Sequence, residues 1–167
     1  MRHRFEYVLE LKDLNPTTAP GTLAKATWRN PSLADQQILA ELMLDSYRDT
    51  IDYDGETMDD SIREVESYFS SQHSAWLESS WLGFMENSLA CASLVGFWKD
   101  RNSPFISYVM TASQWKGKHF ATVGVWRSIQ SLALKNHDKV HAVITEGNTP
   151  SEQVFARLGF RRLAPIE

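Results

Sequence analysis

The chain has 167 residues, of which 43% are hydrophobic and 23% charged, and its formal net charge is −4. These values are ordinary for one globular domain and provide no overall electrostatic attraction to nucleic acid or to an acidic membrane. The single cysteine, Cys91, excludes an intrachain disulfide framework, and no metal site is expected. No apolar run approaches the ~20 residues needed to cross a bilayer, and the N-terminal region lacks a signal-peptide core. We therefore predict one cytoplasmic domain over residues 1–167.

The first half of the chain alternates between short apolar runs and polar connections. Strands are expected at 5–12 and 23–28, separated by a turn-rich linker at 15–21. A helix should begin at 32 or 35 and end at 47, because its apolar residues share one face. A second helix is expected at 57–69, and its first residues match a capping box.

The second half is expected to form strands at 76–85, 89–98, 104–111 and 141–145, a helix at 121–134, and a last helix and short strand. The first two strands form a hairpin around 86–88. After the N-terminal strand, the order is β-α-α-β-β-β-α-β-α-β. This order predicts an α+β fold with three layers.

The most informative stretch is 113–122, Ser-Gln-Trp-Lys-Gly-Lys-His-Phe-Ala-Thr, between an expected strand and an expected helix. Unpaired N–H groups in such a loop and in the first helical turn can bind anionic oxygens. Lys116 and Lys118 add positive charge. The stretch matches neither the Walker A pattern nor the dinucleotide-binding pattern. We predict that a phosphorylated cofactor binds here.

This stretch resembles the pyrophosphate loop of the GNAT superfamily of N-acetyltransferases, whose pattern is Q/R-x-x-G-x-G/A. The best register places Lys116 on the first position, His119 on the central glycine and Ala121 on the last position. Two of these positions depart from the family pattern, since lysine replaces Gln/Arg and histidine replaces glycine.

A second block downstream resembles the other GNAT cofactor motif, a strand followed by N-x-x-[AS]-x-x-[LF]-Y-x-x-x-G-F. The residues that match it in type and spacing are Asn148, Ser151, Val154, Gly159 and Phe160. The local pattern also predicts a helix here, with Thr149 as the N-cap, Pro150 at the first helical position and Gly159 at the end. The resemblance covers 104–160, extends over 23–98 and is absent from the first twenty residues.

The resemblance implies a GNAT-type mixed sheet, mostly antiparallel, with helices on both faces and one parallel strand pair that splays apart. Those two strands are 104–111 and 141–145. Residues 1–20 supply an additional N-terminal strand and linker. Because only seven residues follow Phe160, either this N-terminal strand or a partner subunit would complete the sheet.

The resemblance further implies that acetyl-CoA (coenzyme A) binds with its pantetheine arm between the splayed strands and its pyrophosphate on the loop amides. A backbone N–H would stabilise the charge that develops on the thioester oxygen. The cofactor-binding residues implied are Val109, Met110, Thr111, Lys116, Gly117, Lys118, His119, Phe120, Ala121, Thr122, Asn148, Ser151 and Phe155. The ring of His119 is either a phosphate ligand or an ordinary loop histidine.

A deprotonated amine would attack the acetyl carbon directly, without a covalent enzyme intermediate. Many family members use a tyrosine to protonate the leaving thiolate, and Phe155 stands at that position here. Either Ser151, Tyr108 (if its ring turns toward the cleft) or water would then supply the proton, or catalysis would be slow. Glu146 would accept the amine proton through water, or serve the start of the following helix.

Three acidic residues, Asp52, Asp54 and Glu56, lie in the connection that lines the acceptor pocket in GNAT proteins. They would favour a cationic amine, or form a solvated turn. The predicted function is acetyl transfer to a primary amine of a small molecule or peptide. The alternatives are a non-catalytic acyl-CoA-binding sensor, or a toxin that acetylates charged tRNA, which the acidic chain disfavours. The predicted partner is the amine, with neither nucleic acid nor membrane, and a homodimer is left open.

Overall fold

The computed structural model describes residues 2–14, 20–21, 23–70 and 74–166. The strands are β1 (Arg4–Glu10), β2 (Thr27–Arg29), β3 (Trp81–Met85), β4 (Ser88–Trp98), β5 (Ser103–Thr111), β6 (Lys139–Thr145) and β7 (Arg161–Ile166). The helices are α1 (Gln36–Tyr47), α2 (Met58–Phe69), α3 (Phe120–Leu134) and α4 (Thr149–Arg157). Most of the linker predicted at 15–21 lies outside the described residues.

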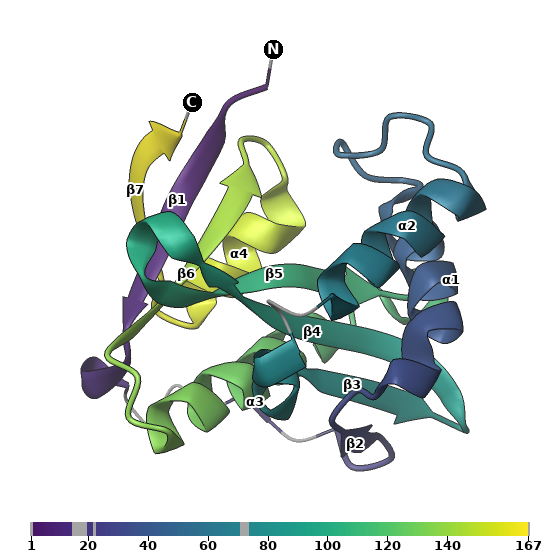
Figure 1. The fold of residues 1–167 in the computed structure, drawn as a ribbon, viewed down its shortest axis with the longest axis horizontal. Helices are drawn as coiled ribbons and strands as arrows, with labels where there is room; N and C mark the ends of the chain where they lie inside the picture. The colour runs from purple at the N-terminus through teal and green to yellow at the C-terminus, as the bar shows by residue number, and fades with distance from the viewer. Residues whose placement is uncertain (1, 15–19, 22, 71–73, 167) are drawn as a thin grey trace.

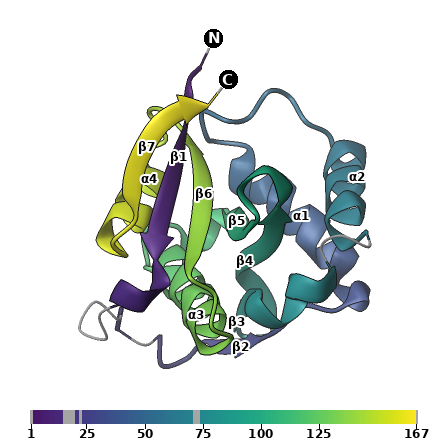
Figure 2. The same ribbon diagram turned by 60° about the vertical axis from the view of Figure 1, so that its left-hand side comes forward.

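The strands form one sheet in the order β2-β3-β4-β5-β6-β1-β7 (Figure 1). Every neighbouring pair is antiparallel except β5 and β6, which are parallel. Helices α1 and α2 cover one face of the sheet, and α3 and α4 cover the other (Figure 2). The predicted three-layer α+β architecture, with a mixed and mostly antiparallel sheet, is therefore confirmed.

The N-terminal strand β1 occupies an inner position, between β6 and β7. It pairs with β6 along its whole length and with β7 over most of it. Tyr7 and Leu9 are buried in the core beneath α3 and α4, and Val8 is buried on the opposite face. The chain's own N-terminal strand completes the sheet, which was one of the two options that the sequence left open.

The parallel strands β5 and β6 separate soon after they meet, as the family resemblance implies. Their pairing is limited to Phe105 with His141 and Ile106 with Ala142. At the same point the register of β5 against β4 shifts by one residue, which makes Ser107 the extra residue of a β-bulge. A bulge bends its strand, so β5 leaves β6 and the backbone beyond it has an edge without a neighbouring strand.

Two predicted strands begin later than the sequence indicates. Residues 23–26 form a turn, in which the Ala26 N–H donates to the Leu23 carbonyl at 2.9 Å, and only 27–29 pair as β2. A 3-10 helix, η4 (Ser74–Ser79), precedes β3, and the ring of Trp76 stacks on Phe97. An apolar or aromatic run predicts burial, but it does not say that the backbone pairs.

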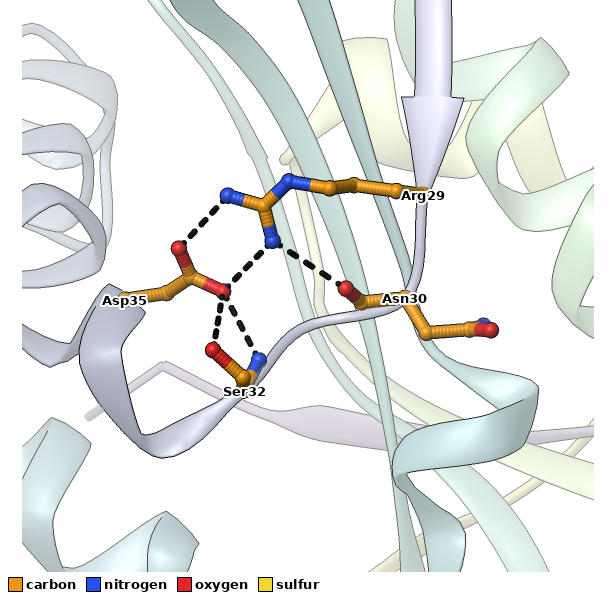
Figure 3. Close-up of polar contacts among 4 residues, drawn as sticks. All are labelled: Arg29, Asn30, Ser32 and Asp35. Atoms are coloured by element: carbon orange, nitrogen blue, oxygen red, sulfur yellow. Dashed lines mark hydrogen bonds and ion pairs between the residues drawn. The ribbon is translucent and has the colours of Figure 1, made fainter.

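The carboxylate of Asp35 fastens the start of α1 to β2 (Figure 3). It accepts two hydrogen bonds of 2.7 Å from the Arg29 guanidinium and one of 2.7 Å from the Ser32 N–H. Arg29 holds the pKa of this carboxyl below its ordinary value. The pair therefore sets where the first helix begins relative to the sheet.

The predicted capping box of α2 is present, because the Asp60 N–H donates to Thr57 and the Thr57 N–H donates to Asp60. The cap of α4 differs from the prediction. The side chain of Asn148, not that of Thr149, accepts from the Ser151 N–H, and Thr149 is the first helical residue. An asparagine is an equally good N-cap, so the local pattern left the start uncertain by one residue.

Candidate functional site

A cavity of about 490 Å³ opens beside the splayed strands, between the end of α1, the loop after β5 and the first turns of α3 and α4. We refer to it as the splay cavity. Its volume is typical of small-molecule sites. Of the predicted cofactor residues, those that line it are Val109, Thr111, Lys116, Gly117, His119, Phe120, Ala121, Thr122, Asn148, Ser151 and Phe155. Met110 is fully buried and Lys118 is exposed, and neither lines the cavity.

The loop that enters α3 contains two left-handed residues, Gly117 with φ of +76° and His119 with φ of +69°. Glycine adopts this conformation without strain, whereas a residue with a Cβ loses about 1–2 kcal/mol. The family's central glycine falls on His119, so the observed backbone explains that preference. The first N–H groups of α3, which lack helical partners, lie at the cavity wall.

Two basic residues line the cavity beside this loop: Lys116, which was predicted, and Arg157, which was not. The ammonium of Lys116 donates to the Ser46 carbonyl at 2.6 Å and so holds the loop against α1. Arg157 lines the splay cavity, with its guanidinium 3.3 Å from Nδ1 of His119. Arginine can only donate, so the guanidinium is the donor in this contact. Arg157 lies inside the second motif block, and the sequence analysis gave it no role.

Trp115 lines the splay cavity and also packs into the core. Its Nε1 is buried and has no hydrogen-bond partner in the described part of the chain, while its ring packs against Phe120. Buried donors in proteins are nearly always satisfied. The fit to a phosphorylated ligand rests instead on the first amides of α3 and on Arg157, which line the splay cavity.

The backbone of β5 offers fewer free groups than predicted. The Ala112 N–H donates to the Ala90 carbonyl, and antiparallel pairing alternates, so Met110 also faces β4. The Thr111 N–H donates to the Ser46 hydroxyl at 3.0 Å. Among the three residues predicted to bind the pantetheine arm, Val109 therefore presents both its N–H and its carbonyl to the gap.

Residues of the second motif are largely committed to other protein groups. Asn148 caps α4 and donates through Nδ2 to Asp52 at 2.8 Å. Phe155 is 3% exposed and packs edge-on against Phe160. Ser151 lines the splay cavity.

Glu146, the predicted base, lies on the surface. Its carboxylate pairs with Arg162 at 3.2 Å, and its N–H donates to the His3 carbonyl. It lines neither of the two cavities described. Of the two roles that the sequence left open, the geometry favours the structural one.

A second cavity of about 330 Å³ lies between α1, α2, their connection and β5, and we refer to it as the acidic cavity. Its charged and aromatic lining consists of Asp52, Glu56, Asp60, Glu64, Tyr47, Tyr53 and Tyr108. Asp54 does not line it, and instead its N–H donates to the Glu56 carboxylate. The structure thus unites two predicted acceptor residues with Asp60 and Glu64 of α2, which the sequence analysis did not identify.

The two cavities adjoin. Tyr47 lines both, and Asp52 of the acidic cavity hydrogen-bonds Asn148 of the splay cavity. Tyr108 and Val109 are consecutive residues of β5 that line different cavities. Burial raises the pKa of Tyr47, and the nearby carboxylates raise it further.

Tyr108 was a predicted proton donor to the leaving thiolate, and its position does not suit that role. Its hydroxyl donates to Glu64 and lines the acidic cavity, not the splay cavity. Burial, together with the Glu64 carboxylate, raises the pKa of Tyr108 well above its ordinary range. The phenol therefore stays protonated and acts as a hydrogen-bond donor.

Comparison with known protein families gives a match to the acetyltransferase (GNAT) domain over residues 26–161. The match spans most of the chain, so the protein belongs to the GNAT acetyltransferase family. A search of curated proteins found no match. Among the described residues, no helix has the length and apolar character needed to cross a membrane.

Solved structures share the fold at low sequence identity. A GCN5-related N-acetyltransferase from Sphaerobacter thermophilus superposes with a TM-score of 0.74 at 15% identity, covering 98% of this chain and 49% of that one. A GNAT-family acetyltransferase from Colwellia psychrerythraea gives 0.71 at 8% identity, covering 97% and 53%. AAC(6')-Iy, in complex with a bisubstrate analogue of CoA and acetylneamine, gives 0.64 at 11% identity, covering 85% and 95%. This chain spans about half the length of the first two.

Proposed function

We propose that this protein transfers an acetyl group from acetyl-CoA to a primary amine of a small molecule or peptide. The observation that carries the proposal is the junction of two chemically different cavities beside the splayed strands. One has unpaired donors and basic groups, and the other is acidic. Their shared wall at Tyr47 would bring an anionic acyl donor and a cationic acceptor together.

The splay cavity would hold the phosphates through the first amides of α3, the guanidinium of Arg157 and the ring of His119. The backbone of Val109 would bind the pantetheine arm. The thioester of acetyl-CoA supplies the activated acetyl group. Donors fixed in advance by the fold stabilise developing negative charge without reorganisation.

Phe155 offers no hydroxyl to the leaving thiolate, and Ser151 is the predicted donor that lines this cavity. A thiol has an ordinary pKa near 8.5 and leaves readily as a thiolate at neutral pH. An acid is therefore helpful but not required. The acceptor is cationic because the acidic cavity lacks lysine, arginine and histidine among its lining residues. The fold relative AAC(6')-Iy is described as an aminoglycoside N-acetyltransferase bound to CoA, which supports this direction.

The cofactor half of the proposal is tested by calorimetric titration of acetyl-CoA into the parent protein, Ala121→Glu and Ala121→Gln. Ala121 lines the cavity at the N-terminus of α3. A carboxylate there suits the helix dipole but repels phosphate. We expect the Kd to rise about tenfold or more in the glutamate variant, about 1.4 kcal/mol, and to change little in the glutamine variant. Equal binding by all three proteins would contradict the assignment of the cavity.

The transfer half is tested by measuring CoA release with benzylamine, spermidine and a lysine-containing peptide. Spermidine should react faster than benzylamine, because it carries more positive charge into the acidic cavity. Acetyl-CoA binding without turnover of any amine would instead indicate a non-catalytic acyl-CoA-binding module. The homodimer stays a prediction, which sedimentation of the same sample checks.

A further inference from the structure

Glu64, in the middle of α2, is joined to Tyr108 of β5 across the acidic cavity. These two residues are 44 positions apart in the chain, so only the packing of α2 over the sheet brings them together. The ring of Tyr108 is held edge-on against the buried ring of Tyr68. The phenol is thus fixed, and the Glu64 carboxylate is placed where β5 passes from one cavity to the other.

Glu64 differs from the other three carboxylates of this cavity in its partners. Asp60 is bound by Arg63 at 2.5 Å and by the Thr57 N–H, and Asp52 is bound by the amide of Asn148. Glu56 accepts from a backbone N–H. In the described ranges, Glu64 accepts a hydrogen bond from the neutral hydroxyl of Tyr108, and no lysine or arginine lies within ion-pairing distance of it.

We propose that the Glu64 carboxylate takes the proton from the acceptor ammonium before acetyl transfer, and that Tyr108 positions this carboxylate. The proposal rests on the proposed function. In this step an N–H bond of the ammonium breaks and an O–H bond forms on one Glu64 oxygen. The nitrogen keeps the electron pair, and the neutral amine becomes the nucleophile. The other Glu64 oxygen keeps the hydrogen bond from Tyr108, whose own proton stays in place.

The groups around Glu64 would hold the cation while it gives up its proton. The titratable groups that line the cavity with it come from α1, the α1–α2 connection, α2 and β5, and they are Tyr47, Asp52, Tyr53, Glu56, Asp60 and Tyr108. The carboxylates of Asp52, Glu56 and Asp60 attract the ammonium before transfer. Tyr47 lines both cavities, and Tyr108 is followed in β5 by Val109 of the splay cavity, so the nitrogen would emerge next to the acyl donor.

The test compares the parent protein with Glu64→Gln, Tyr108→Phe and the control Glu66→Gln, using the fastest of benzylamine, spermidine and the lysine peptide. Glu66 is exposed on the same helix and lines neither cavity described. Glutamine keeps an acceptor for Tyr108 but cannot take the proton. We expect kcat/KM to fall about a hundredfold or more in Glu64→Gln. Its activity should also keep rising with pH where that of the parent is level.

Tyr108→Phe should show a smaller fall, with its pH profile displaced in the same direction, since a purely structural role would leave that profile unchanged. Acetyl-CoA affinity and the melting temperature should match the parent in all three variants. A Glu64→Gln protein with the rate and pH profile of Glu66→Gln overturns this inference and leaves the proposed function standing. Absence of turnover by the parent protein overturns both.

Discussion

At the scale of single residues, the loop between β5 and α3 depends on two left-handed positions, Gly117 and His119. The side chain of His119 is oriented by Arg157, so the histidine that breaks the family pattern gains a partner that the pattern does not contain. Gly117 has open space around it, so its requirement is conformational rather than steric. These positions aim the first amides of α3 at the splay cavity.

Replacing Gly117 with valine should therefore weaken acetyl-CoA binding. A β-branched residue at φ of +76° is strained by about 1–2 kcal/mol, and the loop relieves the strain by leaving the binding conformation. Acetyl-CoA must then supply the free energy that returns the loop to the binding conformation, which should raise the Kd about 5- to 30-fold, as measured by calorimetry. Gly55→Val is the matched control, because Gly55 has φ of +87°, has open space around it and lines neither cavity described. If both variants bind like the parent, the loop does not need this conformation.

At the scale of elements, short polar links set how helices meet the sheet. Asp35 ties α1 to β2, and Asp52 ties the α1–α2 connection to the start of α4. The loop after β5 is fastened to α1 by the Ser113 side chain and N–H on Asp45. Each link joins a segment that lines one cavity to a neighbour, so the links fix the shape of the site.

Asp35→Asn should destabilise the protein by about 1–2 kcal/mol, because the nearly buried carboxylate loses its charged hydrogen bonds while Arg29 remains half-exposed to water. The midpoint of urea unfolding measures this loss. A double-mutant cycle with Arg29→Met tests the pair. Once one partner is replaced, replacing the other should lower the free energy of unfolding by little more. Asp59→Asn, in the exposed first turn of α2, is the control and should leave the midpoint nearly unchanged. If Asp35→Asn lowers the free energy of unfolding equally with and without Arg29→Met, the effect comes from the helix cap alone.

At the scale of the whole molecule, the inner strand β1 makes stability depend on pH. Glu6 of β1 is buried between Arg101, which donates to it at 2.8 and 2.9 Å, and His141 of β6, whose Nδ1 lies 2.9 Å away. Arg101 lowers the pKa of Glu6 below its ordinary 4.5. Burial lowers the pKa of His141 below 6.5. In the folded state, protonation is therefore disfavoured at both sites.

The sign of the pH dependence follows. Below pH 6.5 the unfolded chain binds a proton at His141 before the folded protein does, and below pH 4.5 the same holds for Glu6. The free energy of unfolding should thus fall as the pH drops from 7.5 to 5, and fall further below 4.5. In His141→Leu the free energy of unfolding should change little between pH 7.5 and 5 but still fall below pH 4.5, as followed by urea unfolding at each pH. His3→Gln, at an exposed site, should keep both, and an unaltered slope in His141→Leu would contradict the assignment.

The sequence by itself determined the features that depend on near neighbours. The cap at Thr57, the ends of α1 and α2, the hairpin between β3 and β4, and the spacing of the two cofactor motifs are all set within a few residues. Such contacts form wherever the segment lies in space. This is why the fold class, and most residues of the splay cavity, could be predicted from the sequence.

Only the tertiary structure decided what depends on segments far apart in the chain. In the structure β1 lies inside the sheet, and Glu146 forms an ion pair on the surface. Glu64 contacts Tyr108, which is 44 residues away in the chain. Tyr47 forms the shared wall of two cavities. Side-chain periodicity tells which face of an element is buried, but not which element covers it. The acidic cavity forms where two helices pack over one bent strand, so it depends on the packing and not on a motif.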